Sequence, residues 1–147
     1  MGPLDALPVL GNHSSASLFA HLVWATRHRA SKLEPSADAS LAALLERKAR
    51  RLDARILAAG NAADHVHVLL RYPPRVSVAQ IAHLLKGASS RALNRLAPNH
   101  SLAFWQVGYW AESVGPTDLD PLVGYIRQQR AHHRAHAGLE PWELGPR

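Results

Sequence analysis

Apolar residues along the chain fall into short runs that have either strand or helix periodicity. The run Leu18–Thr26 is apolar at odd and even positions alike, which is typical of a strand covered on both faces. Leucines at helical spacing predict an amphipathic helix over residues 38–53. Residues 54–59 then predict a second strand, which ends at the turn-forming pair Gly60-Asn61.

The second half of the chain continues the alternation of strands and helices. Residues 65–72 predict a strand, because apolar residues dominate until two prolines stop the run. A capping-box pattern predicts a helix that begins at Ser77, and Pro98 ends it. The aromatic stretch 104–114 predicts another strand. Residues 117 to about 136 predict a final helix, with a proline in its first turn.

The predicted order of elements is β-α-β-β-α-β-α, which indicates an α+β fold. Its first six elements match the ferredoxin-like split β-α-β-β-α-β arrangement, an antiparallel sheet with two helices on one face, and the last helix is additional. A length of 147 residues fits one domain. We expect a flexible leader over 1–16, the functional domain over 17–137 and a C-terminal tail over 138–147.

Composition narrows the possible functions. The chain has no cysteine, which excludes disulfides, thiolate zinc sites and cysteine nucleophiles. The formal net charge of +6 favours a polyanionic partner such as nucleic acid, although such an excess also simply aids solubility. No apolar run approaches the roughly 20 residues that span a bilayer. We therefore expect a cytoplasmic protein with no membrane association.

The segment Asp-His-Val-His-Val-Leu-Leu at residues 64–70 carries the first candidate chemistry. On a strand, alternate side chains share a face, so His65 and His67 point the same way while Val66 points into the core. Two adjacent imidazoles can bind a divalent metal. The alternative is a pair of solvated strand histidines, since the His-x-His pattern is short.

The final predicted helix carries the second candidate. At 100° per residue, Tyr125, Gln129, His132 and His136 fall within roughly 60° of one another. A tyrosine on this polar face can act as a nucleophile towards phosphorus. The alternative is a half-buried boundary aromatic. His132, His133 and His136 either contact phosphate or belong to a solvated tail.

Several segments together carry a resemblance to a known family. In chain order they are HLVWATRHR (21–29), DHVHVLL (64–70), LLKGASSRALNR (84–95), FWQVGYWAESVG (104–115) and GYIRQQR (124–130). They resemble the single-tyrosine HUH transposases of small bacterial insertion sequences, also called the IS200-like transposase family. The resemblance covers most of residues 18–134.

The resemblance implies a role for each candidate residue. His65 and His67 would bind the metal with Gln129 as the third protein ligand, and Tyr125 would be the nucleophile. Asp64 would orient a metal-binding histidine, or else it is only a turn residue. Two imidazoles, an amide oxygen and phosphate oxygens suit Mg²⁺ or Mn²⁺.

The resemblance also implies a reaction and partners. Family members cut single-stranded DNA through a 5′-phosphotyrosine intermediate and then rejoin strands. They recognise imperfect hairpins near the ends of the element. They are typically homodimers in which the tyrosine helix of one subunit can complete the site of the other.

Contacts with DNA are expected from basic and aromatic side chains. Arginine and lysine candidates for the DNA backbone are Arg27, Arg29, Lys86, Arg91 and Arg95. The aromatic candidates for base stacking are Trp105, Tyr109 and Trp110, although the two tryptophans also suit the core.

Three other functions remain open from the sequence. A domesticated relative would process chromosomal repeats with the same chemistry. A non-catalytic ferredoxin-like module would bind nucleic acid by stacking bases on aromatic residues of its central strands. A replication or conjugation nuclease of the HUH type is the third, although such domains are usually longer.

Overall fold

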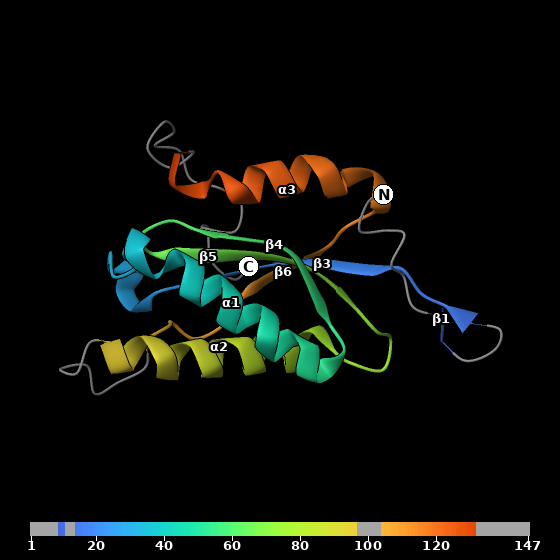
Figure 1. Ribbon diagram of the computed structural model, residues 1–147, viewed down its shortest axis with the longest axis horizontal. Helices are drawn as coiled ribbons and strands as arrows, with labels where there is room; N and C mark the ends of the chain where they lie inside the picture. Colours follow the sequence, from blue (N-terminus) through green and yellow to red (C-terminus); the bar gives the residue numbers. More distant parts are fainter. Residues whose placement is uncertain (1–8, 11–13, 97–103, 132–147) are drawn as a thin grey trace.

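The computed structural model describes residues 9–10, 14–96 and 104–131 (Figure 1). Within the expected leader, two short strands, β1 (Val9–Leu10) and β2 (Ser14–Ser15), pair antiparallel. The expected tail and the histidines at 132, 133 and 136 lie outside the described residues.

A four-stranded sheet forms the centre of the molecule. Its strands are β3 (Leu18–Ala25), β4 (Arg55–Asn61), β5 (His65–Tyr72) and β6 (Trp110–Ser113). They lie in the order β4-β5-β3-β6, and all three pairings are antiparallel. This order places β3 and β5 in the interior of the sheet, as in the predicted ferredoxin-like fold.

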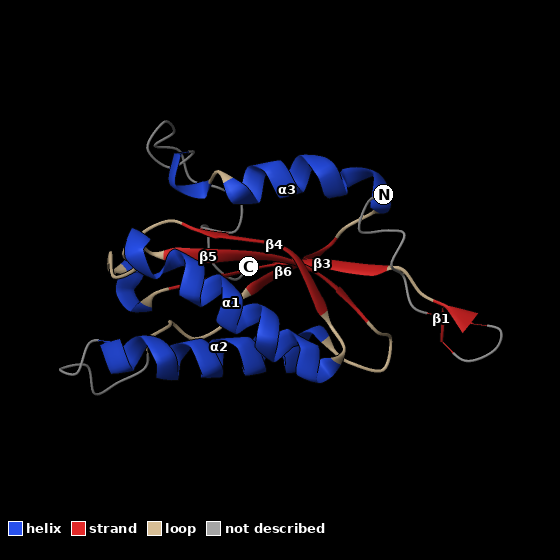
Figure 2. Cartoon of the chain, viewed as in Figure 1, coloured by secondary structure: helices blue, strands red, loops and turns tan. Residues whose placement is uncertain are grey.

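Helices cover both faces of this sheet (Figures 1 and 2). Helices α1 (Asp38–Ala49) and α2 (Val78–Leu96) lie on one face, and α3 (Leu119–Arg127) lies on the opposite face. The prediction of two helices on one face and one additional helix is therefore confirmed. Among the helices of the described residues, none combines the length and the apolar character needed to cross a bilayer.

Strand alternation determines which residues each helix layer meets. The apolar residues Leu22, Trp24, Val68 and Leu70 join Leu41, Leu45, Ile81 and Leu85 of α1 and α2 in the main core. The intervening residues Phe19 and Leu69 join Ala58, Leu119 and Ile126 in a smaller cluster beneath α3. His21, His65 and His67 alternate with the main-core residues, so they share the α3 face of the sheet.

The start of α2 confirms the predicted capping box. The Ser77 hydroxyl accepts a hydrogen bond from the Gln80 backbone N–H at 3.0 Å, and the Gln80 side chain accepts one from the Ser77 N–H at 2.8 Å. In α1, the helix ends at Ala49 and a 3₁₀ turn continues to Leu52, somewhat short of the predicted end at residue 53.

The aromatic stretch 104–114 is not one strand, which corrects the prediction. Trp105 forms only an isolated bridge with Thr26, and regular pairing begins at Trp110. Between them, Gly108 has a φ of 90°. The Lys86 ammonium donates hydrogen bonds to the Gln106 and Gly108 carbonyls at 2.9 and 2.7 Å. These carbonyls therefore bond to a side chain instead of a neighbouring strand.

The final helix is also less regular than predicted. It is preceded by a 3₁₀ turn over Pro116–Asp118, and α3 ends at Arg127. Gln128 leaves the helical conformation, with φ −106° and ψ 23°. Residues 129–131 are helical again, and the predicted continuation to residue 136 lies outside the described residues.

Candidate functional site

The two histidines of β5 lie side by side beneath α3. Both side chains are fully buried, at 0% exposure, and their ring centroids are 5.1 Å apart. In the sheet register, His65 lies opposite Ala25 and His67 lies opposite Val23. The alternative of a solvated pair is therefore wrong, because neither ring reaches water.

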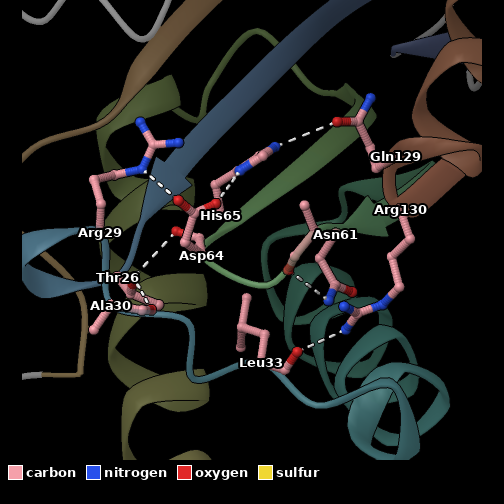
Figure 3. A network of polar contacts seen from close by, with 10 residues as sticks. Thr26, Arg29, Ala30, Leu33, Asn61, Asp64, His65, Gln129 and Arg130 are labelled. Atoms are coloured by element: carbon pink, nitrogen blue, oxygen red, sulfur yellow. Dashed lines mark hydrogen bonds and ion pairs between the residues drawn. The ribbon is translucent and has the colours of Figure 1, made fainter. Parts of the chain in front are cut away.

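Asp64 holds the ring of His65. Nδ1 of His65 lies 2.7 Å from one carboxylate oxygen of Asp64, and the other oxygen accepts a hydrogen bond from Arg29 Nε at 3.0 Å (Figure 3). Burial raises the pKa of Asp64, but the hydrogen bonds with His65 and Arg29 outweigh it and lower the pKa to about 2. The ionised carboxylate therefore accepts N–H bonds from both neighbours.

The turn before His65 is held by its backbone. The Asp64 carbonyl accepts a hydrogen bond from the Thr26 N–H at 2.8 Å. The Ala63 carbonyl accepts hydrogen bonds from the N–H groups of Lys32 and Leu33 at 3.0 and 2.8 Å. Because main-chain atoms make these contacts, they require no particular side chain at Ala63.

Gln129 approaches His65 from the other side. Its side chain is 1% exposed, and Oε1 lies 3.3 Å from Nε2 of His65, although the two residues are 64 positions apart (Figure 3). The Gln129 amide donates to the Tyr125 carbonyl at 3.0 Å, which directs Oε1 towards the ring. When Nδ1–H donates to Asp64, a neutral His65 has a lone pair on Nε2. Two lone-pair atoms then face each other, an arrangement that a proton on Nε2 or a cation stabilises.

Sequence reasoning missed His21 as a site residue. Nε2 of His21 lies 2.8 Å from Nδ1 of His67, and the two rings stack with centroids 5.1 Å apart. Burial lowers the pKa of His21 to about 4, so this imidazole is neutral at neutral pH. Because His21 occupies Nδ1, His67 would bind a metal through Nε2. The one sequence feature that could have indicated His21 was its place in the strand alternation, which puts it on the same face as Phe19.

Tyr125 lies on α3 above the histidines. Its ring meets the His67 ring edge-on, with centroids 5.6 Å apart and an interplanar angle of 81°. The side chain is half-buried and packs against the small apolar cluster beneath α3. Half-burial fits both the nucleophile and the boundary-aromatic interpretation, but only the first predicts a position beside the histidine pair.

The donor atoms in this site suit a divalent cation. They are the imidazole nitrogens of His65 and His67 and the amide oxygen of Gln129. Within residues 9–10, 14–96 and 104–131, no group of three or more His, Cys, Asp and Glu side chains could hold a metal ion. Two imidazoles and one amide oxygen are also fewer than the four firm ligands typical of structural zinc.

The structure separates the predicted DNA-contacting residues into two groups. Arg27 and Arg29 lie in the turn after β3, where Arg29 pairs with Asp64. Arg91 and Arg95 are exposed on α2, which lies on the face of the sheet opposite α3. The Lys86 ammonium is engaged by the two carbonyls described above.

The aromatic candidates also differ in exposure. Trp105 is buried in the main core, where its Nε1–H donates to the Ser89 hydroxyl at 3.0 Å. Trp110 is partly buried and meets the His21 ring edge-on, with centroids 5.2 Å apart. Tyr109 is 42% exposed. Of the three, Tyr109 presents the most surface to a base.

Comparisons with known proteins agree with this geometry. Transposases for insertion sequence element IS200 from Salmonella typhimurium and Salmonella typhi are each 30% identical to this chain over 114 residues, which cover 74% of this chain and 74% of each relative. A crystal structure from Deinococcus radiodurans R1, described provisionally as a transposase, superposes with a TM-score of 0.66 at 25% identity and covers 84% of this chain and 98% of that one.

A second solved structure shares the fold. It is a REP-associated tyrosine transposase bound to a REP hairpin, with a TM-score of 0.56 at 16% identity, covering 80% of this chain and 70% of that one. The family model "Transposase IS200 like" matches residues 14–129, which include the histidine pair, Tyr125 and Gln129. The chain therefore belongs to the IS200-like transposase family.

Proposed function

We propose that this transposase cleaves and rejoins single-stranded DNA, with Tyr125 as nucleophile and Mg²⁺ or Mn²⁺ held by His65, His67 and Gln129. One observation carries the proposal. Gln129 places its amide oxygen 3.3 Å from the His65 ring, one helical turn after a tyrosine that contacts the His67 ring. The site therefore brings together, from distant parts of the chain, a candidate nucleophile, an amide oxygen that could bind a metal and two imidazoles.

The reaction transfers a phosphoryl group between two oxygens. The phenolic oxygen of Tyr125 loses its proton and attacks phosphorus, and the bond to the 3′-oxygen breaks. The products are a 5′-phosphotyrosine and a 3′-hydroxyl, which gains a proton. A divalent cation supplies charge stabilisation on the phosphate and the leaving oxygen. Attack by a 3′-hydroxyl on the phosphotyrosine rejoins a strand, so no external energy source is needed.

The protein's own residues orient the groups that react. Asp64 holds the His65 ring through Nδ1, and His21 holds the His67 ring through Nδ1. With Nδ1 of each ring held in this way, both histidines would bind a metal through Nε2, an arrangement common in metal sites. The natural substrate in this proposal is a DNA strand whose ends form imperfect hairpins, and the positive net charge of +6 favours such a polyanion.

The alternative of a non-catalytic base-stacking module fits the structure less well. Such a module exposes aromatic side chains on its central strands. Here the central strands β3 and β5 present His21, His65 and His67 to α3, which covers them. A repeat-processing role would use the same chemistry, and terminal hairpins in the DNA flanking the coding sequence would distinguish a mobile element from it.

A covalent-adduct assay tests the proposal. Labelled single-stranded oligonucleotides that tile the flanking DNA are incubated with the protein and Mn²⁺ or Mg²⁺, and adducts are resolved under denaturing conditions. We expect a metal-dependent adduct that Tyr125→Phe abolishes. His65→Ala should reduce its rate more than about tenfold, since even partners that merely orient a metal ligand matter by about 10–100-fold.

The exposed Tyr109 provides the matched control. Tyr109→Phe should leave the adduct intact, because it removes only the hydroxyl of a residue that is 42% exposed and keeps the ring. An adduct that persists in Tyr125→Phe would overturn the assignment of the nucleophile. Efficient cleavage of plain duplex DNA without hairpins would contradict the proposed substrate.

A further inference from the structure

Two neighbouring residues in the turn after β3 have an unusual backbone conformation. His28 has φ 59° and ψ 20°, and Arg29 has φ 54°, so both lie in the left-handed region. Residues other than glycine rarely adopt this conformation, because the Cβ atom crowds the following carbonyl oxygen. Such strain persists only where surrounding contacts hold it, and it clusters at functional sites. The contacts around the turn show what it holds in place.

Thr26 closes the turn and ties it to the residue before β5. It is fully buried, and its hydroxyl donates to the Ala30 carbonyl at 2.7 Å (Figure 3). The Thr26 carbonyl accepts a hydrogen bond from the Arg29 N–H at 2.9 Å, and the Thr26 N–H donates to the Asp64 carbonyl at 2.8 Å. Backbone contacts thus fix the turn against the segment that precedes His65.

The shape of the turn places the side chain of Arg29 beside Asp64. Arg29 Nε donates to one carboxylate oxygen of Asp64 at 3.0 Å. The other oxygen lies 2.7 Å from Nδ1 of His65. Figure 3 shows the side chains of Arg29, Asp64 and His65 as one continuous series of contacts. A residue of the turn after β3 is thereby linked to a histidine of β5.

Arg29 supplies a restraint that Asp64 alone lacks. Rotation of a carboxylate about its bond to Cβ is only weakly restricted, so one hydrogen bond to His65 leaves the carboxylate plane poorly defined. The Asp64 side chain is 24% exposed, so water can compete for its oxygens. A directional bond from Arg29 to the second oxygen restricts the rotation. Since a carboxylate can only accept, its fixed oxygen keeps the His65 proton on Nδ1.

We propose that Arg29 is a positioning residue for the metal site, which acts through Asp64 to hold the His65 ring with its proton on Nδ1 and its Nε2 lone pair free for a cation. The strained conformation of His28 and Arg29 accompanies this placement of the guanidinium. The importance for catalysis rests on the proposed function, whereas the restraint on His65 does not. This role differs from the sequence-based expectation, in which Arg29 contacts the DNA backbone.

Nuclear magnetic resonance tests the restraint in the metal-free protein without DNA. With isotope-labelled histidine, the wild type should show a downfield Nδ1–H resonance of His65, assigned by its absence in His65→Ala. In Arg29→Gln this proton should exchange with solvent about tenfold faster, as expected for loss of a hydrogen bond to a charged group. Unchanged position and exchange of the resonance in Arg29→Gln would overturn the proposal.

Arg50 and His28 provide matched controls. The Arg50 guanidinium donates to Glu46 at 2.9 Å at the end of α1, so Arg50→Gln also breaks an arginine–carboxylate pair. His28→Gly keeps the left-handed turn, because glycine adopts this conformation without crowding. Both variants should leave the His65 proton as in the wild type. Equal effects of Arg29→Gln and Arg50→Gln would contradict a specific role for Arg29.

Metal affinity tests whether the restraint on His65 matters to a cation. Mn²⁺ binding, followed by electron paramagnetic resonance, should weaken about tenfold in Arg29→Gln and at least as much in Asp64→Asn. The double variant should bind Mn²⁺ no more weakly than Asp64→Asn alone, because Arg29 acts through that carboxylate. Additive losses, or an unchanged affinity in Arg29→Gln, would contradict a positioning role. A wild type that binds no Mn²⁺ would overturn the metal site and this role together.

The covalent adduct separates positioning from DNA contact and from the proposed function. Adduct formation by Arg29→Gln should be slow at low Mn²⁺ and should recover at saturating Mn²⁺. A defect that persists at saturating Mn²⁺, with normal metal affinity, would instead assign Arg29 to DNA. If the wild type forms no adduct while Arg29→Gln still releases the His65 proton and weakens Mn²⁺ binding, the nuclease proposal fails and the positioning role stands.

Discussion

The two faces of the central sheet are built from the same strands but from different kinds of residue. On the α1 and α2 face, apolar side chains such as Leu70 pack into the main core. On the α3 face, a smaller apolar cluster surrounds three buried histidines. Alternation along a strand allows this division, because neighbouring residues face opposite layers. The larger apolar cluster lies on one face, and the buried histidines lie on the other.

Leu69 and Leu70 give the strongest test of this comparison. They are adjacent, both are 0% exposed, and they face opposite layers. Leu70→Ala should lower the free energy of unfolding by about 3 kcal/mol or more, because it leaves a cavity in the main core. Leu69→Ala should lower it less and should accelerate hydrogen exchange in α3 preferentially. Chemical denaturation and exchange measure the two effects, and equal global losses without a local effect at α3 would show that the layers are not distinct.

Glycine-to-alanine substitutions sharpen the contrast at the α3 layer. Gly60→Ala should destabilise the protein by about 1–3 kcal/mol, because the new methyl group collides with the Ile126 carbonyl. Gly124→Ala, within α3 and with no atom within 4 Å of the added carbon, should stabilise it by up to about 1 kcal/mol. Thermal melting of both variants checks the opposite signs. An unchanged melting temperature in Gly60→Ala would mean that the backbone of α3 does not pack closely against β4.

Substitution of His21 tests whether the polar groups beneath α3 contribute more to metal binding than to the stability of the fold. His21→Phe keeps a ring but removes the nitrogen that contacts His67. We expect Mn²⁺ affinity, followed by electron paramagnetic resonance, to fall about 10–100-fold while the melting temperature changes little. His83→Phe, at an exposed position of α2, is the control. An unchanged Mn²⁺ affinity in His21→Phe would remove His21 from the site.

Lys86 lies on α2, at the edge of the layer that covers the main core, and its substitution should give the smallest change in stability. Lys86→Met removes the donor for the Gln106 and Gly108 carbonyls, which should lower the free energy of unfolding by about 1 kcal/mol. Affinity for single-stranded DNA should change little, whereas Arg27→Gln should reduce it. A large loss of DNA affinity with unchanged stability would restore Lys86 to the DNA-contacting set.

Local patterns were sufficient for β5, for the start of α2 and for the shared face of the histidines, but not for the aromatic stretch 104–114. The bounds of β5 agree with the prediction of residues 65–72, because an apolar run ending at two prolines leaves little choice. The capping box at Ser77 likewise depends only on residues three positions apart. Strand alternation placed His65 and His67 together without any tertiary information.

Contacts between distant segments could not be predicted in this way. The contact of His21 with His67 depends on the register between β3 and β5, which the sequence of either strand alone does not specify. Arg130 finds Asp38 across 92 residues, and no periodic pattern marks such a pair. Lys86 matched a basic, DNA-contacting pattern, but two backbone carbonyls are its observed partners.

The separation of β5 and α3 along the chain also determines the order in which their residues are synthesised. His67 on β5 precedes Tyr125 on α3 by 58 residues (125 − 67). At about 5–20 residues per second, a ribosome needs about 3–12 s to make that stretch. The histidine pair therefore exists in each new chain for several seconds before the tyrosine does. In the proposed mechanism, nascent molecules at that stage would have no group with which to attack DNA.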